Sequence, residues 1–207
     1  MRALVTAFEP YDIWERNSSW DTLVAYVSHQ GANANVLTRR YPVDLARLQS
    51  RLELDLAQGV DAVLHLGQAP GSSGIQLESI ALNIAGVGMN ANSDFGELIH
   101  DAPVAYRTRY PIAKWAQELK SAGIPSHVSY HAGTYLCNAA MYLSHHWFAR
   151  RHEEPLVGFL HLPLTPEQTV GEYAGLPSMS TSVTSHALKW IIDRIFQLNS
   201  SNETQFA

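Results

Sequence analysis

Short apolar runs alternate with longer amphipathic segments along this chain, which is the pattern of strands covered on both faces by helices. The runs are rich in Val, Leu and aromatic residues and are bounded by Gly, Pro or Asp. They predict strands at 2–8, 34–41, 61–68, 126–132 and 156–163. The segment 76–86 predicts a further strand, although its period is ambiguous. The alternation therefore indicates an α/β sandwich.

Helices are predicted between these strands, where apolar residues recur every three or four positions. They fall within 44–58, 111–125, 138–151 and 184–198. There is no internal repeat, low-complexity linker or break in composition. We therefore expect one domain over residues 1–198, built on a mostly parallel, twisted mixed sheet, and a polar, frayed tail at 199–207.

The segment 87–103 lacks a convincing period and is long for a plain connection. Loops of this length are often binding loops or lids. A packed excursion fits the same residues equally well, so both interpretations stay open.

Composition and charge narrow the class of protein. The chain has 207 residues, of which 46% are hydrophobic and 16% charged, and this suits one ordinary globular domain. A formal net charge of -5 gives no reason to expect nucleic acid or an anionic membrane as a partner. The single cysteine, an N-terminus too polar for a signal peptide and the lack of a bilayer-length apolar stretch favour the cytoplasm.

That cysteine, Cys137, lies where a predicted strand gives way to a predicted helix. Ligands of open α/β sheets bind beyond the carboxyl ends of the strands, and the N–H groups of a helix start favour an anion such as a thiolate. The alternative is a small core residue, because cysteine is among the most buried residue types. The presence or absence of a base beside Cys137 decides between a nucleophile and a core residue.

A cysteine nucleophile needs an imidazole, and the imidazole needs a carboxylate or amide that orients it. His161 ends the apolar run "LVGFLH" and is the best placed of 10 histidines, whereas His65 and His131 fit core or edge histidines. Glu78 has apolar neighbours on both sides. A buried carboxylate needs a partner, which His161 would supply; a solvent-facing strand edge is the alternative.

A metal site is the competing interpretation of the crowded residues His145, His146, His152, Glu153 and Glu154. The chain has no H-E-x-x-H motif and no second cysteine, and adjacent histidines diverge on a helix. We expect a solvated helix end there and no metal.

Several motifs, taken in order, resemble a known family. They are "LVTAFEPY", "LGQAPG", "LESIALNIA", "DAPVAYRTRYPI", "GTYLCNAAMY", "GFLHLPLTPEQ" and "PSMS". Together they are similar to the type I pyroglutamyl peptidases, also called pyrrolidone-carboxylate peptidases, over nearly the whole chain. The resemblance implies a three-layer α/β/α sandwich and a cytoplasmic cysteine peptidase without cofactor. It also implies a homotetramer or homodimer, and small peptides with an N-terminal pyroglutamate as substrates.

The resemblance also assigns residues. The nucleophile falls on Cys137, the histidine on His161 and the glutamate on Glu78, in agreement with the positions chosen from the sheet. The pyroglutamyl pocket corresponds to Phe8, Tyr11, Gln68, Tyr135 and Leu136. An apolar slot with few polar contacts suits a small uncharged lactam ring and penalises a charged α-amino group.

The chain departs from the family's common pattern near this site. Ser72 and Ser79 stand where arginine is usual, and Asp12 and Ile13 replace a pair of glycines, adding bulk to the rim. Lost arginines would lower activity or redirect specificity if they held the catalytic loop or stabilised charge.

Two functions therefore remain open. The favoured one is an active exopeptidase that removes N-terminal pyroglutamyl residues. The alternative is a divergent member that binds a lactam or related small molecule with little turnover. A nucleotide-binding protein is weaker still, because "GQAPGSSG" matches no phosphate-binding motif.

Overall fold

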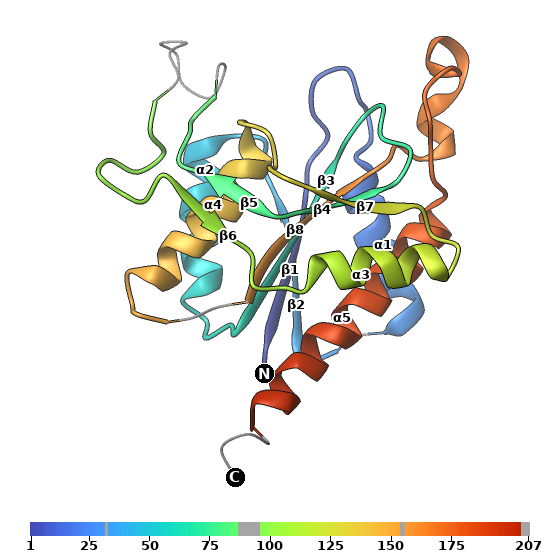
Figure 1. Ribbon diagram of the computed structural model, residues 1–207. Coiled ribbons are helices and arrows are strands. Elements are labelled where there is room, and N and C mark those ends of the chain that lie inside the picture. The colour runs from blue at the N-terminus through green and yellow to red at the C-terminus, as the bar shows by residue number, and fades with distance from the viewer. Residues whose placement is uncertain (32, 87–95, 154–155, 204–207) are drawn as a thin grey trace.

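The computed structural model describes residues 1–31, 33–86, 96–153 and 156–203, with the side chains of 199–203 left out. Its main elements are five helices around a six-stranded sheet (Figure 1). The helices are α1 (Ser18–Gln30), α2 (Leu45–Leu56), α3 (Ile112–Ser121), α4 (Leu136–Ala149) and α5 (Thr181–Glu203). The six strands are β1 (Ala3–Phe8), β2 (Val36–Tyr41), β3 (Ala62–Gln68), β4 (Ile75–Glu78), β7 (Ser126–Ser129) and β8 (Leu156–Leu162).

The sheet is mixed and mostly parallel. Its order is β2-β1-β3-β8-β4-β7, and only the contact between β8 and β4 is antiparallel. The carboxyl ends of β1, β3 and β8 therefore share one edge, where Gln68 pairs with Leu162. Because β4 runs the other way, its first residues reach that same edge, with Gln76 opposite His161.

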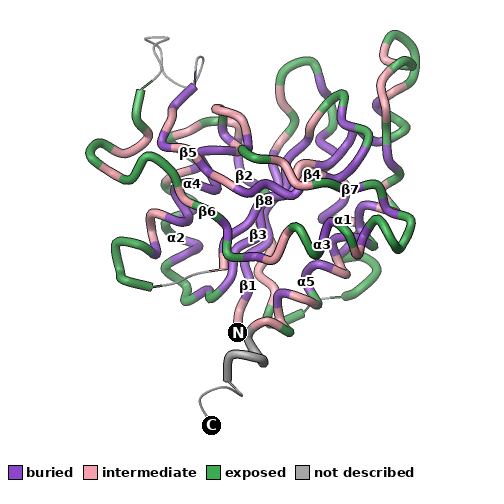
Figure 2. Tube along the Cα trace, in the orientation of Figure 1, coloured by how far each residue is buried: buried purple, intermediate pink, exposed green. Residues whose placement is uncertain are grey.

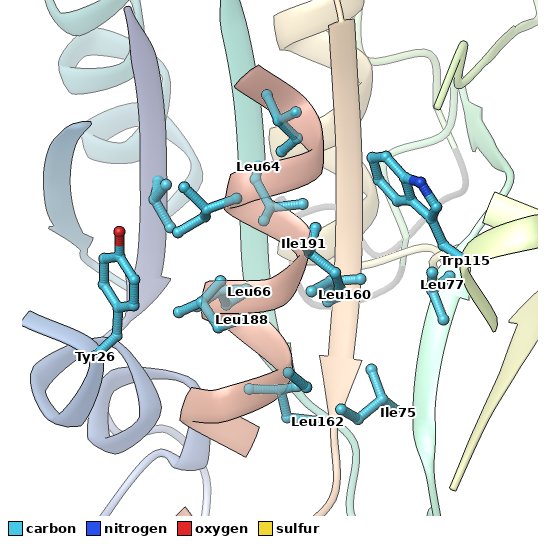
Figure 3. Close-up of a cluster of buried hydrophobic side chains, with 14 of the residues drawn as sticks. Tyr26, Leu64, Leu66, Ile75, Leu77, Trp115, Leu160, Leu162, Leu188 and Ile191 are labelled. Carbon is cyan, nitrogen blue, oxygen red and sulfur yellow. The ribbon is translucent and has the colours of Figure 1, made fainter. Parts of the chain in front are cut away.

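Helices cover both faces of the sheet, so the three-layer α/β/α architecture is confirmed. On one face α1, α3 and α5 bury a cluster that includes Leu64, Leu160, Trp115 and Ile191 (Figure 3). On the other face α2 and α4 bury a second cluster around Leu52, Tyr142 and Phe159. Figure 2 shows the buried strands between these layers.

The ambiguous segment 76–86 is not one strand. β4 belongs to the large sheet, whereas β5 (Ile80–Leu82) pairs with β6 (Ala105–Arg107) in a separate two-stranded sheet. Ser79 is the junction, because its N–H donates to Ser129 O and its carbonyl accepts from Thr108 N–H. Residues of two sheets follow each other here, which explains the unclear period.

The apolar pattern does not predict α1. Its buried face carries Ser18, Ser19 and Thr22 beside Leu23, while Val24 is exposed. A helix whose small polar residues face inward has no clear apolar stripe.

Other boundaries differ modestly from expectation. β7 ends at Ser129, short of the predicted 132, and α5 extends to Glu203, past the predicted 198. Of the segment 87–103, residues 87–95 lie outside the described residues. The remainder packs on the α2/α4 face through Leu98 and Ile99. Within the described residues, no helix is long and apolar enough to cross a membrane.

Candidate active site

A cavity of about 360 Å³ opens at the sheet edge where β1, β3 and β8 end. The predicted catalytic residues Cys137, His161 and Glu78 all line this cavity. So do the predicted binding residues Phe8, Tyr11, Gln68, Tyr135 and Leu136. Residues spread from position 8 to position 161 thus meet in one pocket.

Cys137 is the second residue of α4 and is partly exposed. No side chain caps this helix at Tyr135, so its first N–H groups are oriented toward an anion at the helix start. The thiol also lies against β3: a Cβ built on Gly67 would stand only 2.9 Å from Cys137 Sγ. The missing side chain at Gly67 makes room for the sulfur.

His161 connects the cysteine to the buried Glu78. Its Nδ1 lies 2.7 Å from Glu78 Oε1, which leaves Nε2 for Cys137. The Phe159 ring packs against the imidazole with 4.6 Å between ring centroids. Burial alone lowers the pKa of His161, but the charge and hydrogen bond of Cys137, with those of Glu78, outweigh burial and raise that pKa to about 10. The surroundings therefore favour an imidazolium beside the sulfur.

Glu78 is itself only 1% exposed. Its Oε2 has no hydrogen-bond partner within the described part of the chain. A buried carboxylate of this kind is stabilised by a neighbouring positive charge, and His161 supplies one.

The predicted binding residues surround Cys137, His161 and Glu78 with mainly apolar surface. Phe8 and Leu136 are buried, whereas Tyr135 is 40% exposed at the rim. Burial, followed by the nearby Cys137, raises the pKa of Tyr11 to about 12, so its hydroxyl stays protonated. Gln68 is 5% exposed and brings an amide into this wall.

Four further lining residues carry polar side chains that sequence reasoning did not assign to the site: Asn17, Gln76, His131 and Thr134. Gln76 is brought to His161 by the antiparallel pairing of β4 with β8. Asn17 is the N-cap of α1, and its side chain accepts from Ser19 N–H. The pair "NS" before a helix is a capping signal that indicates a helix start there.

Ser72 and Ser79 are buried just outside the cavity. Ser72 Oγ donates to Gly74 O at 2.7 Å and accepts from Gln76 Nε2 at 3.2 Å. Ser79 Oγ donates to Tyr130 O at 3.1 Å, in the loop before α4. Both serines thus support groups that line or border the pocket.

The larger side chains at the altered rim are exposed and do not enter the cavity. Asp12 and Ile13 are exposed, and neither lines the cavity as described. Asp12 has a φ of 54°, in the left-handed region that glycine adopts most easily and that Asp tolerates. This conformation accounts for the glycine usual at that position.

The remaining histidines have other partners. His65 is buried, and its two ring nitrogens lie 2.6 Å from Thr6 Oγ1 and 2.9 Å from Ser144 Oγ, as expected of a core histidine. His131 follows β7 in an exposed loop rather than lying in a strand. His145 is also buried, in contrast to the solvated helix end expected there. Across the described ranges, no three His, Cys, Asp or Glu side chains are grouped to hold a metal ion.

Comparisons with known proteins identify the family of this chain. Residues 1–198 match the family model described as pyroglutamyl peptidase. The pyrrolidone-carboxylate peptidase of Yersinia pestis (strain Pestoides F) is 34% identical over 203 residues, which cover 95% of this chain and 94% of that relative. The solved pyrrolidone carboxyl peptidase of Thermococcus litoralis aligns with a TM-score of 0.87 at 30% identity, covering 97% of this chain and 96% of that one. The enzyme of Fervidobacterium islandicum AW-1 aligns with a TM-score of 0.84 at 32% identity, covering 95% and 99%. The chain therefore belongs to the pyroglutamyl peptidase family.

Proposed function

We propose that this chain is a cysteine peptidase that removes the N-terminal pyroglutamyl residue from peptides. In this proposal Cys137 is the nucleophile, His161 the general base and acid, and Glu78 the group that orients His161. The observation that carries it is the position of His161, hydrogen-bonded to Glu78 at 2.7 Å and facing Cys137 in the wall of the cavity.

The reaction has two steps. His161 holds the proton of Cys137, and the thiolate attacks the pyroglutamyl carbonyl. The imidazolium protonates the leaving amine, and the peptide bond breaks to give an acyl-enzyme. Water, deprotonated by His161, then attacks the thioester and releases pyroglutamate. In this proposal the N–H groups at the start of α4 stabilise the oxyanion.

The cavity supports a pyroglutamyl ring as the group that is bound. Its volume of about 360 Å³ and its aromatic and aliphatic walls suit a small uncharged ring. A free α-amino group would enter charged and would lose its hydration without a paired carboxylate, because Glu78 is already engaged with His161.

The first test is hydrolysis of a pyroglutamyl coumarin amide, with Cys137→Ala as control and the prolyl analogue as competitor. We expect dye release by the wild type alone, with the prolyl compound ignored. The same result would show that Ser72 and Ser79 are compatible with turnover.

Folded protein that binds pyroglutamate but releases no dye would refute the enzyme and favour the alternative, a lactam-binding member. Arginine restored at positions 72 and 79 would then be tested for recovery of turnover. The cytoplasmic location and the homotetrameric or homodimeric assembly stay predictions of the resemblance.

A further inference from the structure

We propose that Gln168 is a positioning residue that fixes which end of the Gln68 amide faces the cavity. This inference rests on the proposed function and assigns the polarity of its ring pocket. Gln168 lies in the short 3-10 helix Pro166–Thr169, is buried, and does not line the cavity as described. It therefore acts on the ligand only through Gln68.

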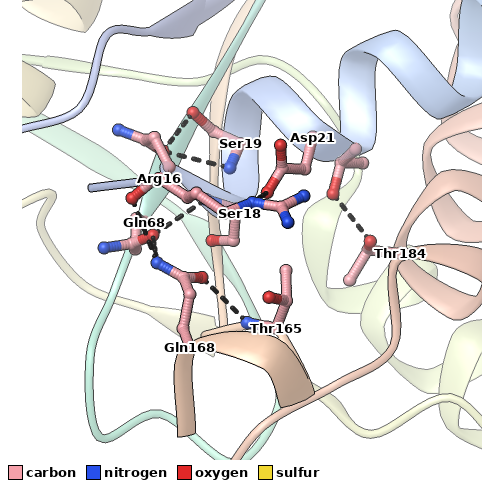
Figure 4. A network of polar contacts seen from close by, with 10 residues as sticks. Arg16, Ser18, Ser19, Asp21, Gln68, Thr165, Gln168 and Thr184 are labelled. Carbon is pink, nitrogen blue, oxygen red and sulfur yellow. Dashed lines mark hydrogen bonds and ion pairs between the residues drawn. The ribbon is translucent and has the colours of Figure 1, made fainter. Parts of the chain in front are cut away.

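The orientation of Gln168 is set by the backbone. Thr165 N–H donates to Gln168 Oε1 at 3.0 Å, and a backbone N–H can only donate. The other end of the amide is then Nε2, which donates to Arg16 O at 3.1 Å and to Gln68 Oε1 at 2.8 Å. Figure 4 shows this chain of contacts.

The orientation of Gln68 follows from two donors on one oxygen. Ser18 N–H, at the start of α1, donates to Gln68 Oε1 at 2.8 Å, beside the contact from Gln168. If the Gln68 amide were flipped, its own N–H groups would face the N–H groups of Ser18 and Gln168. Gln68 Nε2 must therefore point the other way, toward the Tyr11 hydroxyl in the cavity wall, where it is buried and makes no hydrogen bond of ordinary length among the described residues.

An amide nitrogen carries two N–H groups, and the Tyr11 hydroxyl can accept from only one of the two on Gln68. A buried donor in the pocket wall with an N–H group to spare favours a ligand with an acceptor at that point. The ring carbonyl of a pyroglutamyl group supplies one, whereas the proline ring has only methylene groups there. A site built to hydrogen-bond one group rejects the analogue that lacks it more strongly than an apolar wall does. Gln168 thus contributes to discrimination between two rings that it never touches.

The test uses Gln168→Glu, which keeps the shape and the contact with Thr165 N–H but places an oxygen against Gln68 Oε1 and Arg16 O. Thr184→Val is the matched control, because it removes a buried 2.7 Å hydrogen bond to Thr22 on α1, outside the cavity. For each variant we would measure kcat and KM for pyroglutamyl and prolyl coumarin amides, and the alkylation rate of Cys137 by iodoacetamide.

For Gln168→Glu we expect a KM for the pyroglutamyl amide raised about tenfold or more, the equivalent of one lost hydrogen bond. The preference over the prolyl amide should fall in parallel, while Cys137 alkylation stays within about twofold because Cys137 and His161 are untouched. Thr184→Val should keep the wild-type KM. An unchanged KM in Gln168→Glu, or a parallel loss of alkylation, would overturn the inference.

A wild type without turnover would refute the proposed function but not this inference. In that case protection of Cys137 from iodoacetamide by 2-pyrrolidone is the measurement. Weaker protection in Gln168→Glu than in the wild type supports the role of Gln168. Equal protection in both, or none in the wild type, overturns it.

Discussion

At the scale of single residues, Gly67 determines how close the thiol comes to the sheet. Gly67 lies opposite His161 in the pairing of β3 with β8. A Cβ at this position would stand 2.7 Å from the Phe159 ring and 2.9 Å from Cys137 Sγ, and neither is the end of a flexible chain. Both the Cys137 thiol and the ring behind His161 would have to move.

If Cys137 is the nucleophile as proposed, we expect Gly67→Ala to lower kcat/KM on the order of a hundredfold, the effect of displacing a reacting group by about an ångström. Overpacking should also destabilise the fold by about 1–3 kcal/mol. Steady-state kinetics and urea unfolding measure both effects. Gly175→Ala, where an added Cβ meets open space, is the control and should leave both unchanged. Wild-type kinetics in Gly67→Ala would contradict the close approach.

The protonation of His161 gives a second residue-scale prediction. Cys137 contributes strongly to the raised pKa of about 10, whereas burial opposes it. In Cys137→Ala the pKa of His161 should therefore fall well below that of the wild type. NMR titration of the imidazole carbons measures it, with the resonance assigned through His161→Gln. The control is His65, whose pKa burial lowers to about 3 and which should not respond.

The raised pKa also has a consequence for stability. The folded state binds the His161 proton more tightly than the unfolded chain does, because the pKa of a histidine in an unfolded chain is about 6.5. The stabilisation from this proton is therefore complete below pH 6.5 and is lost as the pH rises through about 10. An identical His161 titration in wild type and Cys137→Ala would contradict the contribution of the thiol.

The candidate site was partly predictable at this scale. Gln68 and His161 lie at the ends of β3 and β8, which are parallel and share one sheet edge, as the sequence predicts. Cys137 reaches the cavity by another route, because β7 is parallel to β4 and runs opposite to β8. The expectation that Cys137 follows a strand ending at this edge was therefore wrong, and the loop before α4 brings the thiol to the cavity. Gln76 was not predictable, because it reaches the edge only through the reversed direction of β4, which no apolar pattern reports. Gln168 was hidden as well, because its role depends on which backbone groups meet its amide.

At the scale of elements, Asn138 attaches the start of α4 to the small sheet. Its Oδ1 accepts from Leu82 N–H at 2.8 Å, and its Nδ2 donates to Leu82 O at 2.9 Å and Ile84 O at 3.2 Å. Asn138 is fully buried and directly follows Cys137. One side chain thus satisfies the edge of β5 and fixes the helix turn that carries Cys137.

Asn138→Leu should lower the free energy of unfolding on the order of 3 kcal/mol, because it leaves buried backbone groups of β5 unpaired. Urea unfolding followed by circular dichroism measures this change. Gln117→Leu makes a similar change on the exposed face of α3 and should shift stability by less than about 0.5 kcal/mol. Equal stability of the two variants would exclude the anchoring role.

The elements themselves followed the apolar pattern where one face is plainly buried. The buried strands β3 and β8 and the striped helix α2 lie within a residue or two of their predicted bounds. The pattern failed at α1, whose buried face is polar, and at Ser79, where the chain passes from one sheet to another without a turn residue. Period alone cannot detect either arrangement.

At the scale of the whole molecule, two buried histidines that the proposed reaction does not use lie on β3 and on α4, His65 and His145. Burial lowers the pKa of His65 to about 3, with a further contribution from His145, and lowers the pKa of His145 to about 4. His145 Nε2 has no hydrogen-bond partner within the described ranges. Both rings are therefore neutral in the folded protein at neutral pH.

This arrangement predicts loss of stability in mild acid. Below pH 6.5 the unfolded chain binds protons at these histidines that the folded chain does not, so the free energy of unfolding falls as the pH drops from 6.5 toward 4. His145→Phe keeps an aromatic ring stacked on Tyr106 but cannot bind a proton. The free energy of unfolding of this variant should therefore fall less steeply in acid than that of the wild type. At pH 4.5 the variant should retain on the order of 2 kcal/mol more of its neutral-pH stability. Urea unfolding of both proteins from pH 7 to 4.5 measures the difference, to which carboxylates common to both contribute little. If the free energies of unfolding of both proteins fell in parallel with pH, His145 would be protonated without unfolding, and its buried surroundings would tolerate the charge.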